Sequence, residues 1–399
     1  MEALRGFRDI WGEDWEKFEE IVSTFKNRLS NFNVVWIETP ILEPLELFVR
    51  SVGEFTDIVQ KQMFSFRDRG DREVALRPEG TAGVVRAFIE NRLSYPIRLA
   101  YFGPMFRAER PQKGRYRQFY QLGVEFIGFS GPYADAEGII SAYLPLKDLG
   151  LKVKVFVNTL GGEETKFKYS ENLRDYLKDL DFLCEDCKRR REKNPLRVLD
   201  CKVCSPKLSV PDILEFVPKT ERENFDKTIN ILEKYGIPFE RDPKLVRGLD
   251  YYTGLVFEIK AEDLEAAQNT ILAGGRYDNL ISQLGGENVP AFGWAAGIDR
   301  ISLIYKPNKK PKDLYFVVRT SDEYLDEAFE VLIKLRDLNK RVDMVFELGK
   351  SLKAQMRRAN KMGARWVIFV GKDEVERGVL KIKDMESGEE AILVDIPTL

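Results

Sequence analysis

The densest group of side chains that could do chemistry lies in residues 106–125, FRAERPQKGRYRQFYQLGVE. Two strand-like runs flank a Pro-Gln-Lys-Gly turn, so the pattern predicts a long hairpin whose loop carries Arg107, Glu109 and Arg115. Arginine binds phosphate oxygens in a bidentate way, which suits such a loop to a nucleoside triphosphate or an RNA backbone. The alternative is a solvated hairpin whose charges pair with one another.

A second group is formed by the four cysteines, which are all the cysteines in the chain. They make two C-x-x-C pairs, Cys184 with Cys187 and Cys201 with Cys204. This spacing is typical of a zinc ribbon, and in a chain without histidine the site would consist of four thiolates. Free thiols and disulfides are the alternatives, although disulfides are disfavoured in an ordinary cytosol.

The chain contains no histidine at all. This absence excludes Ser-His-Asp and Cys-His catalysis and every zinc site that needs an imidazole. Any catalysis must therefore rest on carboxylates, arginines, lysines, hydroxyls and bound ions. Chance is the alternative explanation for the missing residue type.

These groups need a scaffold, and the apolar patterns predict a large antiparallel sheet flanked by helices. Apolar residues at 18, 21, 22, 25 and 29 predict a helix over 16–32. Strand-like runs then recur in KQMFSFRD, EVALRPE, IRLAYFGPMFRA and QFYQLGVEFIGF. The chain has neither GxGxxG nor GxxxxGK[ST], so a Rossmann or P-loop nucleotide site is not expected.

Changes of composition along the chain predict an α+β fold of several parts. A polar helical stretch that contains the cysteines interrupts the series of strand-like runs. A run rich in Pro and Lys then precedes alternating strand and helix patterns. We predict a sheet domain, an insertion, a linker and a C-terminal α/β domain at residues 1–166 with 241–305, 167–240, 306–310 and 311–399, respectively.

Whole-chain composition is that of an ordinary globular protein. The 399 residues include 63 Lys and Arg against 65 Asp and Glu, for a formal net charge of -2, so any RNA contact must come from local basic patches. No apolar run approaches the roughly 20 residues that span a bilayer, and the start of the chain is acidic and amphipathic. We therefore expect no membrane partner and a cytoplasmic location.

Several motifs together resemble one family. The pattern FR-x-E-RPQ-x-GR-x-RQF-x-Q, which begins at Phe106, is similar to the second signature motif of class II aminoacyl-tRNA synthetases in its histidyl form. ETP with Pro40 resembles the first motif, and GWAAGIDR at 293–300 resembles the third, with Asp299 where many members have Glu. RPEGT at 77–81 and LVRGLDYYTG at 245–254 resemble segments that distinguish the histidyl enzymes from their relatives.

The resemblance extends over nearly the whole chain. It includes GGRYDNL at 274–280, and SLKAQMRRANKMGARWVIFVG at 351–371 is similar to the anticodon-binding domain of the histidyl-tRNA synthetases. The implied fold is a six-stranded antiparallel sheet with flanking helices, a helical insertion and a C-terminal α/β domain, assembled as a homodimer. The implied reaction activates histidine with ATP to histidyl-adenylate and pyrophosphate, and then transfers histidine to the 3′ end of tRNA(His).

The resemblance also implies residue roles in ATP binding. Arg107 would hold the α-phosphate and Arg300 the distal phosphates, with Glu109 near the adenine or a bound magnesium ion and Arg115 also at the ATP. Arg247 would stand beside the α-phosphate as an additional active-site arginine. Fixed cations stabilise the charge that develops on the phosphate oxygens, and a carboxylate nucleophile needs no general base.

Histidine would be recognised by a second set of residues. Neutral imidazole presents one N–H and one lone pair, so the site needs partners for both nitrogens. The resemblance assigns Glu125 and Tyr252 to the imidazole, with Tyr251, Tyr277 and Arg247 close to the amino acid; Glu79, Thr81 and Gln121 take its ammonium group. Core packing is the alternative role for Tyr251 and Tyr252, and Gln112 and Arg115 are candidates for contact with the tRNA acceptor end.

Three other functions compete with this interpretation. One is a regulatory relative with the same sheet domain, but such proteins lack the C-terminal domain and the phosphate-binding arginines. The others are a class II synthetase of another specificity and an RNA-binding protein without catalysis. The histidyl reading gives the missing histidines a meaning as a hypothesis, because an enzyme without histidine can be resynthesised when charged histidine tRNA runs out.

Overall fold

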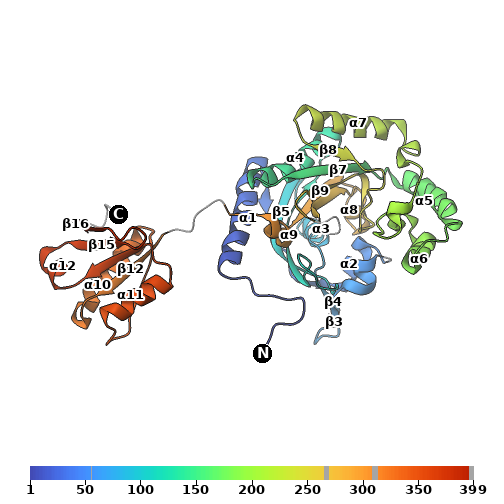
Figure 1. Ribbon diagram of the computed structural model, residues 1–399. Helices are drawn as coiled ribbons and strands as arrows, with labels where there is room; N and C mark the ends of the chain where they lie inside the picture. Colours follow the sequence, from blue (N-terminus) through green and yellow to red (C-terminus); the bar gives the residue numbers. More distant parts are fainter. Residues whose placement is uncertain (55, 265–268, 308–312, 395–399) are drawn as a thin grey trace. The chain divides into compact units, whose positions relative to one another are not determined.

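The computed structural model describes residues 1–54, 56–264, 269–307 and 313–394 (Figure 1). The chain forms two compact units, Met1–Lys306 and Pro307–Leu399. Residues 308–310 of the predicted linker lie outside the described residues. None of the described helices is long and apolar enough to cross a bilayer.

An eight-stranded sheet forms the centre of the first unit. Its order is β1, β5, β6, β11, β10, β9, β7 and β8. The six central strands pair antiparallel, while β1 and β8 join the edges in parallel, so the predicted antiparallel sheet is confirmed. In this order the strands span Val35–Trp36, Ile97–Phe106, Gln118–Ile127, Ala291–Gly297, Thr270–Arg276, Thr253–Ala261, Val153–Thr159 and Phe239–Arg241.

Helices α1, α4, α7 and α9 share one large core with the sheet. They span Glu13–Leu29, Pro132–Asp148, Lys219–Lys234 and Ile298–Ile304. The five apolar positions that predicted the first helix are all buried, and its acidic first turn is favourable at a helix N-terminus. The helix begins three residues earlier than predicted, directly after Gly12 with φ 60°, and ends in a short 3₁₀ turn, η1 (Ser30–Phe32).

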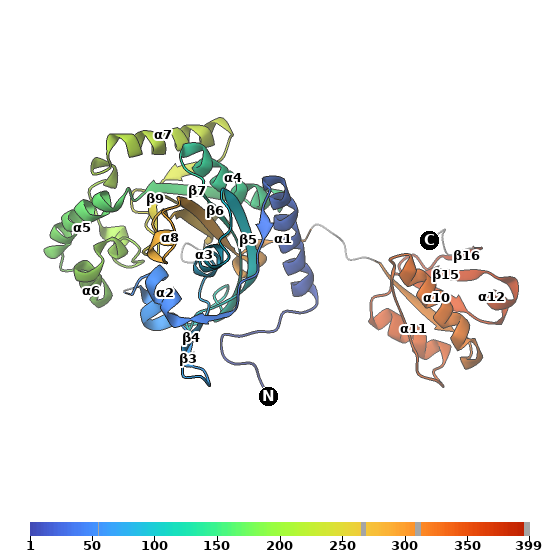
Figure 2. The ribbon, with the colours of Figure 1, turned by 180° about the vertical axis from the view of Figure 1, so that it is seen from behind.

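Shorter elements form a second core with the sheet (Figure 2). They include α3 (Thr81–Glu90), which begins directly after the RPEGT segment, and α8 (Leu280–Gln283). A small three-stranded sheet, β2-β4-β3, lies beside them with α2 and the π-helix η2. These elements span Leu42–Pro44, Glu73–Leu76, Ser65–Arg67, Leu45–Val52 and Ile58–Gln62.

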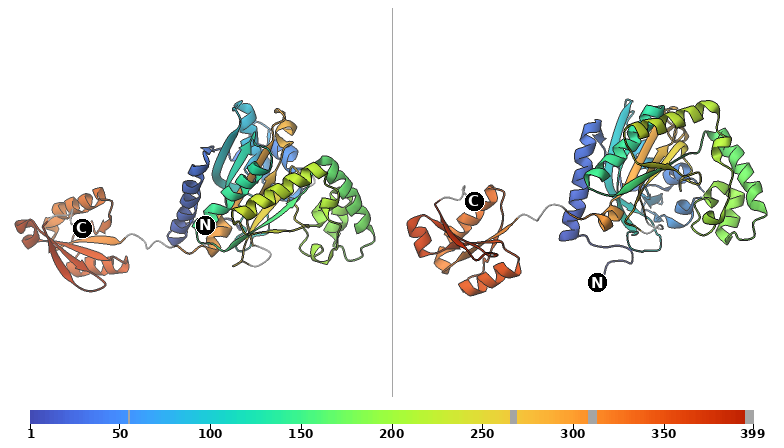
Figure 3. Two further views of the ribbon diagram at one scale, coloured as in Figure 1. Left: turned by 90° about the horizontal axis from the view of Figure 1, so that it is seen from above. Right: turned by 45° about the horizontal axis from the view of Figure 1, so that its top comes forward.

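The segment predicted as an insertion divides in its packing. Its first part holds α5 (Glu163–Lys178), α6 (Glu185–Lys193) and the short 3₁₀ helices η3 (Pro195–Val198), η4 (Ser205–Lys207) and η5 (Ile213–Glu215). Figure 3 shows α5 and α6, in green, at the end of the sheet unit away from α1. Helix α7 instead packs against α4 and buries Phe225, Ile231 and Leu232 in the main core.

The second unit is a five-stranded mixed sheet with helices, as the alternating pattern predicted. Its order is β13-β12-β14-β15-β16, with the first two pairings parallel and the last two antiparallel. The strands β12 to β16 span Leu314–Arg319, Arg341–Met344, Trp366–Val370, Leu380–Asp384 and Glu390–Leu393. A 3₁₀ turn, η6 (Asp322–Tyr324), precedes α10 (Leu325–Asp337), which is followed along the chain by α11 (Leu352–Lys361) and α12 (Lys372–Arg377).

Candidate active site

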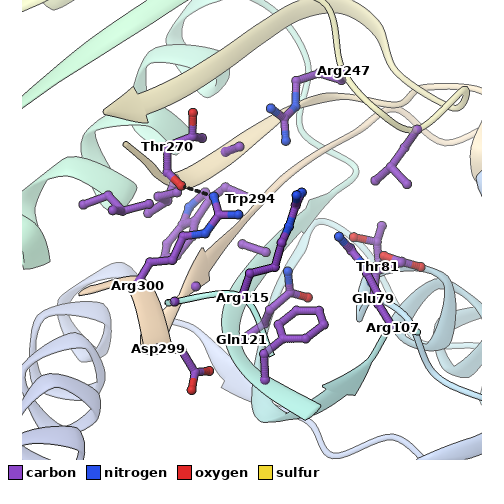
Figure 4. Close-up of a pocket in the computed structure, with 18 of the residues that line it drawn as sticks. Glu79, Thr81, Arg107, Arg115, Gln121, Arg247, Thr270, Trp294, Asp299 and Arg300 are labelled. Atoms are coloured by element: carbon purple, nitrogen blue, oxygen red, sulfur yellow. Dashed lines mark hydrogen bonds between the residues drawn. The ribbon is translucent and has the colours of Figure 1, made fainter. Parts of the chain in front are cut away.

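One cavity of the first unit gathers most of the side chains that the sequence singled out (Figure 4). It is bounded by the β5–β6 hairpin, the start of α3, strands β10 and β11, and the loop between β8 and β9. The predicted site residues that line it are Glu79, Thr81, Arg107, Glu109, Arg115, Gln121, Arg247, Tyr251, Tyr252 and Arg300.

The remaining predicted residues lie elsewhere. Glu125 and Tyr277 are fully buried and do not line the cavity; they lie one layer below it, where Thr81 connects them to the cavity wall. Gln112 is exposed on the hairpin turn, where its backbone pairs with that of Arg115, but unlike Arg115 it does not line the cavity. The four cysteines lie in the insertion, with their sulfur atoms within 4.8 Å of one another.

The hairpin aims two guanidinium groups at the cavity. Backbone hydrogen bonds between Gln112 and Arg115 close a tight turn, which needs the positive φ of 73° at Gly114. Arg107 donates from Nε to the carbonyl oxygen of Pro78 at 2.9 Å, which fixes its direction. The Glu109 carboxylate forms an ion pair with Arg115 at 2.5 Å, and it lies 3.8 Å from the guanidinium of Arg107.

Two further arginines reach the cavity from other elements. Arg300 lies in α9 and donates from Nη1 to the carbonyl oxygen of Thr270 at 2.6 Å, the contact drawn in Figure 4. Arg247 forms an ion pair with Glu258 of β9, and Thr270 Oγ1 donates to the same carboxylate at 2.9 Å. Glu258 therefore connects both arginines to neighbouring strands, a role that the sequence did not suggest.

Burial lowers the pKa of two of the arginines at this cavity. Burial lowers the pKa of Arg300, and the nearby guanidinium groups of Arg115 and Arg107 lower it further. Burial likewise lowers the pKa of Arg107. Four guanidinium groups line this one cavity, and such a group of arginines can bind the oxygens of a polyanion such as a triphosphate.

Carboxylates and hydroxyls form the other end of the site. Glu79 accepts the backbone N–H groups of Thr81 and Ala82 at 2.7 and 2.8 Å, at the start of α3. Glu125 accepts hydrogen bonds from Thr81 Oγ1 at 2.8 Å and from the Tyr277 hydroxyl at 2.5 Å. Burial raises the pKa of Glu125 to about 8, and the neighbouring Glu79 contributes to the rise. The hydrogen bonds from Tyr277 and Thr81 act in the opposite direction and lower the pKa.

Glycines make room for these groups on the sheet. Gly293 pairs with Glu125 across β11 and β6, and a Cβ at this glycine would overlap the carboxylate. Gly123 pairs with Tyr101 across β6 and β5, and a Cβ there would overlap the tyrosine ring and hydroxyl. Both positions can therefore be only glycine while the buried side chains keep their places.

Three polar atoms at the cavity have no partner among the described residues. They are the Tyr101 hydroxyl, Gln121 Oε1 and Arg247 Nε, all buried on residues that line the cavity. Buried polar groups are almost always hydrogen-bonded, so one hydroxyl, one amide acceptor and one guanidinium donor indicate the place of a polar ligand. The sequence did not single out Tyr101; its pairing opposite Gly123 in the predicted hairpin is the signal that could have found it.

Comparison with known proteins identifies what the chain is similar to. Residues 6–161 and 212–301 match the family model described as Histidyl-tRNA synthetase, and residues 313–397 match the one described as Anticodon binding domain. A histidine–tRNA ligase of Aquifex aeolicus is 45% identical over 399 residues, which cover 98% of each chain. One from Thermosipho melanesiensis is 44% identical and covers 97% of this chain and 94% of its own.

A solved structure agrees with these relatives. The apo crystal structure of S. aureus histidyl-tRNA synthetase has a TM-score of 0.81 and 32% sequence identity to this chain. The match covers 98% of this chain and 97% of that one, so both the sheet unit and the C-terminal unit have counterparts in it.

Proposed function

Because the chain belongs to the histidyl-tRNA synthetase family, we propose which of its residues carry the family's reaction. The protein is an aminoacyl-tRNA synthetase that joins histidine to tRNA(His) with ATP as co-substrate. The observation that carries the assignment of residues is the convergence of Arg107, Arg115, Arg247 and Arg300 on one cavity beside unpartnered polar atoms.

The first step forms histidyl-adenylate. The carboxylate oxygen of histidine attacks the α-phosphorus of ATP, and pyrophosphate leaves with the electron pair of the broken P–O bond. Arg107 and Arg247 stabilise the negative charge on the α-phosphate oxygens, and Arg300 holds the distal phosphates. Magnesium would accompany ATP and neutralise phosphate charge, with Glu109 as the carboxylate beside these cations.

The second step transfers histidine to tRNA. The terminal ribose hydroxyl attacks the carbonyl carbon of the adenylate, and AMP leaves. Arg115 and Gln112 of the hairpin are the residues that we assign to the acceptor end, and 311–399 is the domain that we assign to the anticodon stem. The match of residues 313–397 to an anticodon-binding model supports the second assignment.

Recognition of histidine follows from the polar end of the cavity. Glu125 and Tyr252 are the partners that we assign to the imidazole, with Tyr251, Tyr277 and the unpartnered hydroxyl of Tyr101 beside them. Glu79, Thr81 and Gln121 take the ammonium group, for which Gln121 Oε1 is a free acceptor. A buried polar site of this kind rejects amino acids that lack the matching nitrogens.

Other parts of the proposal concern assembly. We keep the boundaries 1–166 with 241–305 for the catalytic domain and 167–240 for the insertion, and we assign a structural zinc ion to the four cysteines. We also propose a homodimer that works in the cytoplasm. The dimer is supported by exposed apolar side chains on β1 and β2 and the segment between them, which include Trp36, Ile41 and Leu42.

The rival function is a regulatory protein that binds histidine without activating it. The anticodon-binding unit and the four arginines disfavour this rival. ATP–pyrophosphate exchange with each amino acid in turn tests the proposal. Exchange with histidine alone is the expected result; no exchange by folded protein with magnesium present would favour the regulatory function instead.

A further inference from the structure

The four cysteine sulfurs have the spacing of a tetrahedral metal site. All four lie within 4.8 Å of one another, and those of Cys184 and Cys201 are 3.9 Å apart. Sulfurs at the corners of a tetrahedral zinc site with Zn–S bonds of about 2.3 Å lie about 3.8 Å apart. Backbone N–H groups of Cys184 and Cys204 point at the sulfurs of Cys204 and Cys201, at 3.3 and 3.4 Å, which favours thiolate charge.

Helix α6, which begins within the first cysteine pair, buries little apolar surface of its own. Helix α6 has nine residues, and Cys187 is the only one of them that is buried. A helix this short is marginal in water unless an apolar face packs against a core. A metal ion that binds both ends of residues 184–204 would add to the packing of Val198 and Leu199, since metal binding contributes directly to folding free energy.

This same segment holds the backbone of the loop that carries Arg247. Arg197 of η3 donates from Nη1 to the carbonyl oxygen of Arg247 at 3.1 Å. Asn194 donates to the Asp250 carboxylate at 3.0 Å, three residues farther along the loop. Gly248 leaves the space for this contact, because a Cβ there would lie 3.0 Å from Arg197 Nη1.

Arg197 is itself placed by the cysteine segment. Its guanidinium is buried, and it lies 3.7 Å from Asp57 and 3.8 Å from Asp200. The backbone N–H of Cys201 bonds the carbonyl oxygen of Val198, the residue after Arg197, at 3.1 Å. Cys201 is therefore four residues from Arg197 along the chain and is hydrogen-bonded to the residue next to it.

We propose that a metal ion bound by the four cysteines positions the catalytic Arg247 through Arg197 and Asn194. In this arrangement Arg197 is a positioning residue: it contacts the loop and not the substrates. The inference rests on the proposed function, since it takes Arg247 as the arginine at the α-phosphate. A guanidinium displaced by about 1 Å from its transition-state position can slow a reaction about a hundredfold.

The first experiment addresses the metal. We expect about one zinc ion per chain by mass spectrometry of the purified protein. Replacing it with cobalt should give the visible and near-ultraviolet absorption of a tetrahedral Co(II) tetrathiolate, and the double variant Cys187→Ser, Cys201→Ser should lose it. Metal-free wild type that folds and exchanges pyrophosphate with unchanged kcat would overturn the role of the ion.

The second experiment addresses the coupling in metal-loaded protein. Arg197→Ala should lower kcat of histidine-dependent pyrophosphate exchange about tenfold or more, while KM for ATP and for histidine stays within about twofold. Arg197→Lys should recover part of kcat, because one ammonium can still donate to the carbonyl oxygen. The matched control is Arg189→Ala, an exposed arginine of α6 that pairs with Asp186 of the same helix.

The outcomes separate this inference from the function on which it rests. Wild type that fails to exchange with histidine contradicts the proposed function. Wild type that exchanges, with Arg197→Ala unchanged in kcat or altered only in KM, contradicts the positioning role alone. A fall in kcat that merely follows loss of folded protein, as measured by thermal unfolding, also overturns it.

Discussion

At the scale of single residues, the ion pair between Arg247 and Glu258 fixes one of the guanidinium groups of the cavity. Arg247 is partly buried, keeps a buried and unpartnered Nε, and is the only one of the cavity arginines that we place at the α-phosphate from outside the hairpin. Its pairing with Glu258 holds the guanidinium in place before ATP binds. Preorganised cations of this kind stabilise developing charge without reorganisation during the reaction.

Replacing this arginine should separate binding from chemistry. Arg247→Ala is expected to slow adenylate formation by about a hundredfold or more, because the charge on the α-phosphate loses one fixed partner. Histidine affinity, measured by calorimetry without ATP, should change little, since the imidazole and ammonium contacts remain. Single-turnover formation of adenylate at an unchanged rate would show that the catalytic assignment is wrong.

The raised pKa of Glu125 predicts how the stability of the folded protein depends on pH. Burial raises its folded-state pKa to about 8, with Glu79 adding to the rise, so the folded protein keeps this proton while the unfolded chain loses it above its ordinary value. Unfolding then releases a proton. The contribution of Glu125 to the free energy of unfolding is therefore present in full at low pH and is lost as the pH rises toward 8. The free energy falls by up to about 1.4 kcal/mol per pH unit.

The variant Glu125→Gln tests this directly. It should flatten the decline in thermal stability of the ligand-free protein between pH 5 and 8. Part of the decline should persist, because burial also raises the pKa of Glu79. Identical slopes for the variant and the wild type would contradict the buried neutral state of Glu125.

The sequence motifs include most of the residues in the cavity, but they do not include Glu258 or Tyr101. Glu258 is the one carboxylate in the strand text LVFEIKA, and its importance depends on Arg247, eleven residues away in an irregular loop. Tyr101 looks like one more core aromatic until the register places it opposite Gly123. The role of Glu258 arises from tertiary pairing, which residue type and spacing do not encode, whereas that of Tyr101 depends on the register of the hairpin.

At the scale of elements, strand β11 shows how a missing side chain shapes the site. Gly293→Ala places a Cβ against the Glu125 carboxylate, and overpacking of a well-packed interior typically costs about 1–3 kcal/mol. We expect lower thermal stability and weaker histidine binding together. Gly297→Ala on the same strand is the stability control, since its nearest neighbour would be 3.8 Å away. Equal stability of the two variants would contradict the proposed crowding.

The edge strand β1 is the element that we connect with assembly. Trp36 and Val35 are 41% and 52% exposed at the end of the sheet, beside the exposed Ile41 and Leu42. A large exposed apolar surface of this kind marks an interaction site. Trp36→Glu should shift the protein toward monomer in analytical ultracentrifugation, whereas Tyr235→Glu, at an exposed aromatic after α7, should not. A monomeric wild type would contradict the dimer.

Regular elements were the most predictable part of the fold. The helix over 16–32 and the long strands followed from apolar periodicity, and the five predicted buried positions of α1 are all buried. The packing of helix α7 was harder to predict. Its polar sequence is similar to the rest of the insertion, yet the helix packs on α4 in the main core. Periodicity identifies which face is apolar, but it does not say which surface that face meets.

At the scale of the whole molecule, the contact between Arg197 and Arg247 joins a segment outside the family match to the loop that carries Arg247. Nothing in the sequence relates these two positions, which are fifty residues apart. The C-terminal unit was easier to predict, because its strands and helices alternate regularly from β12 to β15. Contacts between distant segments are thus the part of this molecule that only the structure provides.

The absence of histidine is a property of the whole chain, and it predicts behaviour under starvation. Synthesis of this enzyme consumes none of the product that it makes, so the chain can be translated when charged tRNA(His) is scarce. A variant with Phe167→His and Tyr235→His changes two exposed aromatic side chains outside the cavity and should keep the reaction and the fold. In a translation extract depleted of histidine, wild type should appear at full length while the variant stops early. Cells that rely on the variant should then resume growth later after histidine starvation than cells with the wild type. Equal recovery of the two strains would mean that the missing histidines carry no such advantage.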